Sequence, residues 1–334
     1  MNKVAFITGA SRGIGKATAL AFARAGYDLI ISARTLEDGE RHSHGLRRAD
    51  GSALPGSLAS TAAEIRTLGR RVREIRLDLL DDSSVLSAAD VALRAFGRVD
   101  VLVNNAIYQG SDLNLPFLEL EPATLKRVYQ GYVLAPFLLT RAIVAGMLEH
   151  GGGTVINVTS GAGESDPPVP AARGGWGYAY GAGKAAVSRL SGVLVTELGA
   201  QGIRAFTVNP GVVDTEALQA TIGAKGVQTL GGRVAPPQVP ADVMVWLATS
   251  PEADALQKRT LNAQSLARER GLGQAAAFFK SKKNKDGYDV VLLALQDWMA
   301  QPMSPRVVPG RTTSMPRISA SASSFLPAWL SWEA

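Results

Sequence analysis

The feature that most constrains this chain is the alternation of short β-branched runs with segments of helical length. Seven runs are strand candidates: Val4–Thr8, Asp28–Ala33, Val72–Leu77, Val99–Asn104, Thr154–Thr159, Arg204–Val208 and Lys258–Ala263. Several are almost continuously apolar, as is typical of parallel strands covered on both faces. Segments such as Gly15–Ala25 and Ser83–Phe96 carry apolar residues at helical spacing between them. We therefore expect an α/β fold, a doubly wound parallel sheet of about seven strands with helices on both faces.

This alternation ends near residue 272, so we expect one domain over residues 1–272 and a C-terminal extension over residues 273–334. In the extension, Tyr288–Ala300 could form one amphipathic helix, whereas Pro302–Ser324 is rich in Ser, Pro and Arg and is typical of disorder. Two insertions interrupt the domain, at Gly39–Ser57 and at Gly161–Gly175. The first contains a His-Ser-His sequence without a third ligand nearby, so we interpret it as an exposed loop and expect no metal.

Composition narrows the partners and the location that we expect. The 334 residues include no cysteine, which excludes disulfides, thiolate chemistry and zinc–cysteine sites. The chain opens on a strand-like run from residue 4, which leaves no room for a signal peptide. No apolar run approaches membrane-spanning length. We therefore expect a cytoplasmic protein without a membrane partner.

The net charge of +6 raises the question of nucleic-acid binding. From residue 273 onward there are seven basic and four acidic side chains, so this stretch contributes +3 of the total. Lys280, Lys282, Lys283 and Lys285 form a short basic run that could touch phosphates. A solvated charged stretch is the preferred interpretation of so short a run, and nucleic acid is not an expected partner.

A glycine-rich stretch, Thr8-Gly9-Ala10-Ser11-Arg12-Gly13-Ile14-Gly15, lies where the first predicted strand turns into the first predicted helix. Glycine lets backbone amides approach a pyrophosphate closely, and the N-terminus of a helix favours its negative charge. A simple tight turn would also use glycine, but the strand–turn–helix context favours a dinucleotide site. The predicted contacts are Gly9, Ser11, Arg12, Gly13, Ile14 and Gly15.

The end of the second predicted strand bears on the choice of dinucleotide. An NAD site usually has an acid here for the ribose 2′-hydroxyl, whereas an arginine can bind a 2′-phosphate. The chain has Ala33 and then Arg34, and Arg12 supplies a second cation. We therefore expect NADP(H) to be preferred, with NAD(H) possible. Asp78 and Leu79, after the third strand, could edge the adenine pocket, although Asp78 could equally cap the following turn.

Taken in order, five motifs resemble those of the short-chain dehydrogenase/reductase superfamily, and the match covers residues 1 to about 270. They are the glycine-rich stretch, Asn104-Asn105-Ala106 after the fourth strand, Ser160 after the fifth, Tyr180-x-x-x-Lys184, and Pro210-Gly211 with Thr215. The resemblance implies a Rossmann-type fold and an NAD(P)-dependent enzyme acting on CH–OH groups. It also implies a homodimer or homotetramer built from the helices around residues 120–148 and 180–199.

Further cofactor contacts follow from the same resemblance. It implies that Asn105 and Ala106 lie along the nucleotide, and that the segment with Pro210, Gly211, Val213 and Thr215 contacts the nicotinamide carboxamide. Tyr180 and Lys184 also contact the cofactor in this family, because the lysine binds the nicotinamide ribose.

The Tyr-x-x-x-Lys motif carries the predicted chemistry. Reduction of a ketone needs a hydride donor, a proton donor and a group that holds the carbonyl oxygen. A phenol is a poor acid at neutral pH, but an ammonium one helical turn away favours its ionised form. Tyr180 and Lys184 have that spacing, whereas Tyr178 does not. Ser160 follows an apolar strand and could hold the carbonyl oxygen or merely cap a turn. The predicted catalytic residues are Tyr180 as acid/base, Ser160 and Lys184.

Three departures from the family pattern stand out. Ile107 follows Ala106 where the family usually has glycine, and Tyr132 lies where the family has an asparagine that carries a water-mediated proton relay. Ser160 and Tyr180 are 20 residues apart, where the family commonly has about a dozen. The extra residues lie in Gly161–Gly175 and should border the substrate. Trp176 and Tyr178 could therefore be walls of the substrate site, although Trp176 could equally pack the loop down.

The region after Pro210, through Gly231-Gly232-Arg233-Val234, is where this family has a mobile lid over the substrate, and its Gly and Pro content suits a hinged loop. The leading hypothesis is thus an NADP(H)-preferring oxidoreductase that interconverts a secondary alcohol and a ketone. The alternative is a catalytically weak or inactive NAD(P)-binding scaffold or sensor of the same fold. Tyr132, Ile107 and the long insertion favour the alternative, and the intact Ser, Tyr and Lys set favours the enzyme.

Overall fold

The structure is a computed structural model that describes residues 2–221 and 234–273. In this part of the chain, all strands run parallel in one seven-stranded sheet of order β3-β2-β1-β4-β5-β6-β7. The strands are β1 Val4–Thr8, β2 Asp28–Ala33, β3 Val72–Arg76, β4 Val101–Asn104, β5 Gly153–Val158, β6 Ile203–Asn209 and β7 Thr260–Asn262. The chain reverses its direction of winding between β1 and β4, which confirms the predicted doubly wound sheet.

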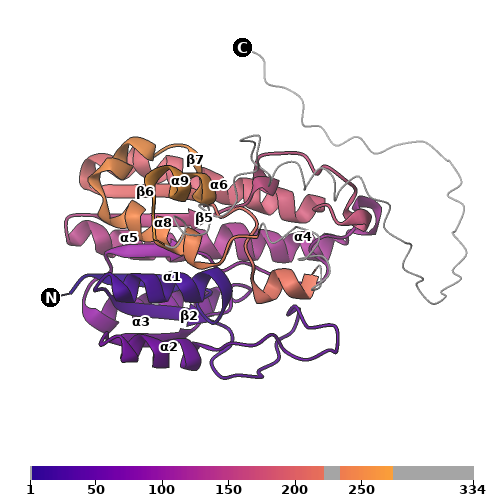
Figure 1. The fold of residues 1–334 in the computed structure, drawn as a ribbon, viewed down its shortest axis with the longest axis horizontal. Coiled ribbons are helices and arrows are strands. Elements are labelled where there is room, and N and C mark those ends of the chain that lie inside the picture. The colour runs from indigo at the N-terminus through magenta and orange to yellow at the C-terminus, as the bar shows by residue number, and fades with distance from the viewer. Residues whose placement is uncertain (1, 222–233, 274–334) are drawn as a thin grey trace, which may run out of the picture. The chain divides into compact units, whose positions relative to one another are not determined.

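Helices cover both faces of this sheet (Figure 1). They are α1 Gly13–Arg24, α2 Leu58–Thr67, α3 Asp82–Phe96, α4 Pro122–Tyr129, α5 Ala135–Glu149, α6 Tyr178–Leu198, α8 Gln238–Thr249 and α9 Ala263–Arg270. A π-helical turn, Gln130–Leu134, joins α4 to α5 without a break. The helices α1, α2, α8 and α9 share one hydrophobic core with the sheet, and α3, α5 and α6 share the other.

The two cores follow from the pleat of the strands. Successive side chains of a strand point to opposite faces, so an apolar run feeds both cores at once. In β1, Ala5 and Ile7 pack into the core of α1 and α8, whereas Val4 and Phe6 pack into the core of α3 and α5. This explains why the central strands read as continuous apolar sequence rather than as an alternation.

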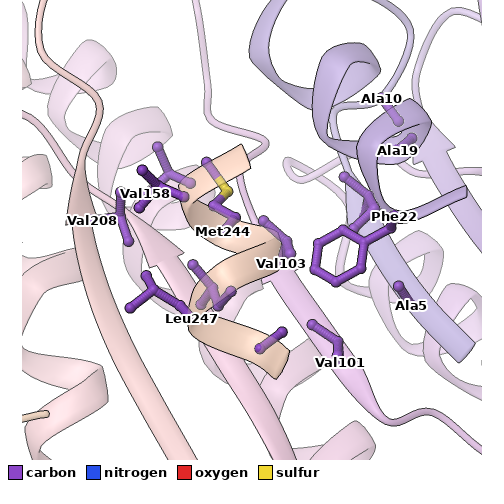
Figure 2. Packing of buried hydrophobic residues seen from close by; sticks show 14 of the residues in the cluster. Ala5, Ala10, Ala19, Phe22, Val101, Val103, Val158, Val208, Met244 and Leu247 are labelled. Atoms are coloured by element: carbon purple, nitrogen blue, oxygen red, sulfur yellow. The ribbon is translucent and has the colours of Figure 1, made fainter. Parts of the chain in front are cut away.

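The first core is tightly interleaved between helices and sheet. Figure 2 shows Phe22 of α1 beside the central strands, and Met244 and Leu247 of α8 reaching toward Val158 and Val208. All five side chains are at most 4% exposed. Burial on this scale contributes about 1.5–3 kcal/mol for each large side chain, so this layer anchors the strands whose ends form the site.

A ladder of buried polar side chains crosses the middle of the sheet. Asn104 Nδ2 donates to Asn157 Oδ1 at 2.8 Å, and Asn157 Nδ2 donates to Ser191 Oγ at 2.8 Å. The ladder continues to Thr140 of α5 on one side and to Thr207 of β6 on the other. Buried polar groups are costly unless they are paired, so these bonds specify how α5 and α6 lie on the sheet.

The continuous helical run Pro122–Glu149 is long and apolar enough, by length and composition alone, to cross a membrane. The expectation that no apolar run approaches that length is therefore wrong for this segment. Half of the most apolar 18-residue stretch of this run is buried within the fold, where α5 packs on α3 and on the sheet. A core helix of this kind passes the same test because its buried face is apolar over many turns.

The two insertions differ in how they fold. Residues 39–57 form a largely exposed loop, as predicted, with a single antiparallel bridge between Arg47 and Ala53. The loop ends at Ser57, which forms a capping box with Ser60 at the start of α2. The second insertion contains two short 3₁₀ turns, at Gly161–Gly163 and Ala171–Arg173.

Some predictions fall on residues that the structure does not describe. The predicted extension from residue 274 onward lies outside the described residues, and so does Gly231–Arg233 of the predicted lid. The division into residues 1–272 and 273–334 therefore stays a prediction.

The polar ladder makes a testable statement about stability. Replacing Asn157 by alanine leaves one buried N–H of Asn104 without its acceptor and opens a small cavity, so we expect Asn157→Ala to lower the free energy of unfolding by about 2 kcal/mol. Urea denaturation at neutral pH measures this loss. Leu86→Ala, at an exposed site of α3, is the control and should change stability by no more than about 0.5 kcal/mol. Equal losses in both variants would contradict a structural role for the ladder.

Candidate active site

One cavity of about 550 Å³ opens at the carboxyl ends of the strands, around the point between β1 and β4 where the sheet reverses. Crevices at this position are the usual ligand sites of doubly wound sheets. Every predicted cofactor and catalytic residue lines this cavity: Gly9, Ser11, Arg12, Gly13, Ile14, Gly15, Arg34, Asp78, Leu79, Asn105, Ala106, Ser160, Tyr180, Lys184, Pro210, Gly211, Val213 and Thr215. Segments more than 200 residues apart in sequence thus meet at one edge of the sheet.

The glycine-rich stretch forms a close turn that tolerates no side chain at two of its positions. A Cβ on Gly15 would lie 2.1 Å from the backbone oxygen of Gly9, and one on Gly9 would lie 2.8 Å from Nδ2 of Asn105. Gly9 and Gly13 also have φ angles of +70° and +54°, in the left-handed region that glycine adopts without strain. The glycines therefore serve the packing of the turn as well as leaving a cradle open toward the cavity.

Thr8 and Asn105 join the two strands at this reversal. The hydroxyl of Thr8 donates to Val103 O at 3.1 Å and accepts from the backbone N–H groups of Asn105 and Ala106 at 3.0 Å. The side chain of Asn105 donates back to Thr8 O at 2.9 Å. These bonds hold the glycine turn against the end of β4, so the floor of the cavity is built before any ligand enters.

The first insertion holds the two arginines that were predicted to select the dinucleotide. Arg12 donates from Nε to Pro55 O and from Nη2 to Gly56 O, both at 2.9 Å. Arg34 donates to Ser43 O at 3.1 Å. These carbonyls restrain both guanidinium groups at the rim of the cavity, and a second cavity of about 60 Å³, lined by both arginines, adjoins it under the loop.

The nearest acid of the loop is already neutralised. Glu40 pairs with Arg76 at 3.1 Å and lies 3.5 Å from His42. Arg76 also donates to the backbone oxygen of Arg34 at 2.8 Å, which joins this pair to the end of β2. Glu216 and Asp38 are the further acids that act on Arg12.

The three predicted catalytic side chains lie close together. Ser160 follows β5, and its side-chain hydrogen bond with Tyr180 partly offsets the burial that raises the pKa of the phenol. Lys184 is 3% exposed, and its Nζ donates to Val158 O at 2.9 Å. Burial lowers the pKa of Lys184 to about 7. Ser160 also accepts from Ala162 N–H at 3.3 Å, so it caps a turn and contacts Tyr180 at the same time.

Helix α6 is held onto the end of β5 by a second set of bonds. The hydroxyl of Thr159 donates to Lys184 O at 3.0 Å and lies 2.9 Å from Oγ of Ser188. Thr159 and Ser160 therefore both meet α6, the helix that carries Tyr180, and both line the cavity. The turn at Gly163 also packs on α6, because a Cβ there would lie 2.7 Å from the carbonyl carbon of Lys184.

Tyr132, at the position of the family asparagine, is buried beside this centre. Its ring centroid lies 5.6 Å from Nζ of Lys184, and its ring meets that of Tyr180 edge to face at 6.4 Å. A Cβ on Gly183 would lie 2.7 Å from the Tyr132 ring, so only glycine in α6 leaves room for it. Tyr132 thus packs in the core, and its ring contacts two of the predicted catalytic side chains.

The segment after Ala106 contains residues that sequence reasoning missed. Ile107 lines the cavity together with Tyr108, and Tyr108 donates to Oδ1 of Asp112 at 2.6 Å. Asp112 also accepts from Thr124 Oγ1 at 2.6 Å and forms an ion pair with Arg127 of α4. No motif marked Asp112 and Arg127, because their 15-residue separation carries no periodic signal.

Trp176 and Tyr178 are absent from the described lining of the cavity. Trp176 is half-buried and lies over Gly181, and the Tyr178 ring is exposed and meets that of Phe117 edge to face at 6.1 Å. Their role as substrate walls stays a prediction. Asp78 does accept a hydrogen bond from Leu80 N–H at 3.0 Å, so it caps a turn while it lines the cavity.

No group of three His, Asp or Glu side chains in the described parts of the chain could hold a metal ion. A further acid that sequence reasoning missed is Glu216, which lines the cavity near Gly13. Its buried Oε2 has no hydrogen-bond partner among the described residues. Glu216 directly follows Thr215 of the Pro-Gly motif, so its adjacency to a predicted contact was the available signal.

Comparisons with known proteins agree on one family. The family model described as short chain dehydrogenase matches residues 3–57 and 52–225. The short chain dehydrogenase mpl6 of Monascus purpureus is 34% identical over 73% of this chain and 75% of its own length. The 7alpha-hydroxysteroid dehydrogenase of Escherichia coli strain K12 is 31% identical over 66% of this chain and 74% of its own length.

The fold agrees with the same family. A solved 7 alpha-hydroxysteroid dehydrogenase, complexed with NADH and 7-oxo glycochenodeoxycholic acid, superposes with a TM-score of 0.63. It is 29% identical in sequence, and the match covers 78% of this chain and 92% of that one.

The Asp112 cluster predicts a pH dependence of stability. Burial alone would raise the pKa of Asp112, but hydrogen bonds from Thr124, Tyr108 and Arg127 outweigh it and lower the pKa to about 2. Because this is below the value in the unfolded chain, the ionised carboxylate stabilises the fold above about pH 4, and this contribution is lost as the pH falls toward 2.

We expect Asp112→Asn to lower the free energy of unfolding by about 2 kcal/mol at pH 7. Urea denaturation between pH 7 and pH 3 should show the difference from the parent shrinking below pH 4. Asp166→Asn, at an exposed position of the second insertion, is the control and should show little difference at either pH. A difference for Asp112→Asn that stays constant with pH would contradict the assignment.

Proposed function

Because this chain belongs to the short chain dehydrogenase family and is an NAD(P)-dependent oxidoreductase, we propose that it interconverts a secondary alcohol and a ketone with NADP(H) as the preferred cofactor. In this proposal Tyr180 is the acid/base, Ser160 holds the carbonyl oxygen, and Lys184 tunes Tyr180. The observation that carries it is the meeting of these three side chains and the glycine-rich turn in one cavity. Oxidation of the alcohol and reduction of the ketone are the two directions of one reaction, so both use these residues.

The described residues fit a dinucleotide. The glycine turn leaves a cradle of backbone N–H groups at the N-terminus of α1, where the helix dipole favours a pyrophosphate. Asn105 and Ala106 would follow the nucleotide along the end of β4, and the segment from Pro210 to Thr215 would hold the nicotinamide end. When bound, the nicotinamide supplies or accepts the hydride.

Tyr180 and Ser160 provide the proton and the oxygen contact. A carbonyl oxygen placed between their hydroxyls would receive a hydrogen bond from Ser160 while Tyr180 gives up its proton. Lys184 lies one helical turn from Tyr180, and a positive charge there makes the resulting phenolate less costly. In the oxidation direction the same phenolate accepts the proton of the alcohol.

The preference for NADP(H) is supported by the charges around the end of β2. Ala33 offers no carboxylate to a ribose 2′-hydroxyl, and Glu40 is paired with Arg76. Arg34 and Arg12 approach from two sides, and their bonds to loop carbonyls leave other guanidinium N–H groups for a phosphate. A 2′-phosphate would therefore meet two restrained cations, whereas a 2′-hydroxyl would meet no carboxylate at the end of β2.

The role of Tyr180 is tested by two tyrosines of the same helix. We expect Tyr180→Phe to lower kcat for NADPH-dependent carbonyl reduction by about a thousandfold or more, because the proton donor is lost. Tyr178→Phe is the matched control and should keep kcat within about twofold of the parent, since the Tyr178 hydroxyl has no predicted part in proton transfer and phenylalanine keeps the ring that a substrate wall would use. The measurement is NADPH oxidation over a panel of steroid, cyclic and acyclic ketones. A fully active Tyr180→Phe would overturn the mechanism.

The cofactor preference is tested by a charge reversal. We expect Arg34→Asp to weaken NADPH relative to NADH by about tenfold or more, because a carboxylate repels the 2′-phosphate and accepts from a 2′-hydroxyl. Cofactor fluorescence titrations give both dissociation constants. Arg48→Asp makes the same charge change at an exposed position of the same loop, away from the described lining, and should leave the ratio within about twofold. An unchanged ratio in Arg34→Asp would argue against the preference.

A further inference from the structure

The ammonium of Lys184 lies in an almost dry environment. The side chain is 3% exposed, and the described hydrogen bond of its Nζ is the one to Val158 O at 2.9 Å. An ammonium has three donors, and a buried charge without compensation shifts toward its neutral form. Burial accordingly lowers the pKa of Lys184 to about 7. A catalytic role for the charge therefore needs something else that favours it.

The ring of Tyr132 is positioned to provide this. Its centroid lies 5.6 Å from Nζ of Lys184, within the range at which a cation is attracted to an aromatic ring. The same ring contacts Tyr180 edge to face at 6.4 Å. Tyr132 thus touches both members of the Tyr-x-x-x-Lys pair from the opposite side of the core.

Two local features make room for the ring. Tyr132 lies in the π-helical turn Gln130–Leu134, which widens the helix where it passes α6. On the facing helix, Gly183 presents no side chain, and a Cβ there would clash with the Tyr132 ring at 2.7 Å. The glycine next to Lys184 and the π turn are therefore complementary parts of one arrangement.

The hydroxyl of Tyr132 does not explain the arrangement. Tyr132 is 1% exposed, and its hydroxyl oxygen has no hydrogen-bond partner among the described residues. The described contacts of Tyr132 with Lys184 and Tyr180 are both made by its ring. What tyrosine shares with phenylalanine, and not with leucine, is the aromatic face.

We propose that Tyr132 is a positioning residue whose aromatic face keeps Lys184 in its charged form and fixes it beneath Tyr180. The consequence of this inference for catalysis rests on the proposed function, but the effect of the ring on the charge of Lys184 exists without substrate. The ring replaces part of the solvation that the Lys184 ammonium loses on burial. The edge contact of the same ring with Tyr180 fixes the separation between Tyr180 and Lys184.

The groups that surround Lys184 define what can titrate with it. From its own helix these are Tyr180 and the uncharged Ser188, from the end of β5 they are Thr159 and Ser160, and from the π turn it is Tyr132. Burial raises the pKa of both tyrosines, so both stay neutral near pH 7. A titration of the free protein near pH 7 at this centre therefore reports on Lys184.

The test compares two replacements of Tyr132. NMR of the full chain labelled with 13C at the lysine ε carbon gives the pKa of Lys184 in the free protein, and Lys184→Met identifies its signal. We expect Tyr132→Phe to leave this pKa within about 0.2 units of the parent, and Tyr132→Leu to lower it by about one unit. Removing the ring removes an interaction that favours the charged form of Lys184, so the pKa of Lys184 should fall.

A kinetic readout follows the same comparison. The alkaline limit of kcat/KM should move to lower pH by about one unit in Tyr132→Leu and should not move in Tyr132→Phe. Tyr132→Met, which fills similar space without a ring, replaces Tyr132→Leu if the latter does not fold by circular dichroism.

The outcomes separate the possibilities. A parent-like pKa of Lys184 in Tyr132→Leu, or in Tyr132→Met, would overturn the inference. The inference would also fail if Tyr132→Phe lowered this pKa as much as Tyr132→Leu does, because the effect would then belong to the hydroxyl. If the parent reduces no ketone, the proposed function fails, yet the NMR comparison still decides whether the ring holds the charge.

Discussion

The hydrogen bond from Lys184 Nζ to the last carbonyl of β5 is the contact on which the site depends. It brings the buried face of α6 onto the end of the sheet, and the bond from Thr159 to Lys184 O holds the helix backbone there. Tyr180, one turn earlier, then meets Ser160 without further adjustment. Because a buried ammonium is costly, every neighbour that offsets this cost also positions the chemistry.

The two insertions modify this common frame at opposite ends of the cavity. Residues 39–57 provide backbone carbonyls that accept hydrogen bonds from Arg12 and Arg34, so a loop outside the sheet orients these two cations at the rim of the cavity. The turn at Gly161–Gly163 packs on α6 at Lys184, so the second insertion begins with a contact to the helix that carries Tyr180 and Lys184. Both insertions therefore contact residues that line the cavity.

Several elements were predictable because they rest on local chemistry. The apolar runs of the parallel strands, the glycine turn and the Tyr-x-x-x-Lys spacing each carry a signal within a few residues, and all of them occur where predicted. The apolar length of Pro122–Glu149 was not predicted, because polar residues interrupt the apolar run in the sequence. The mean hydropathy of the helix is high all the same. The Asp112–Arg127 pair and the Gly183–Tyr132 contact had no such signal, since their partners lie far apart in sequence.

The sequence by itself determined the fold class, the edge of the sheet that carries the site, and the identity of its central side chains. These follow from periodicity and from motifs whose spacing has one structural meaning. Only the tertiary structure decided what surrounds Lys184. Whether the ring at position 132 solvates a charge or merely fills space depends on the 5.6 Å between Nζ of Lys184 and the centroid of that ring. Gly183 and the π turn leave the room in which the ring lies.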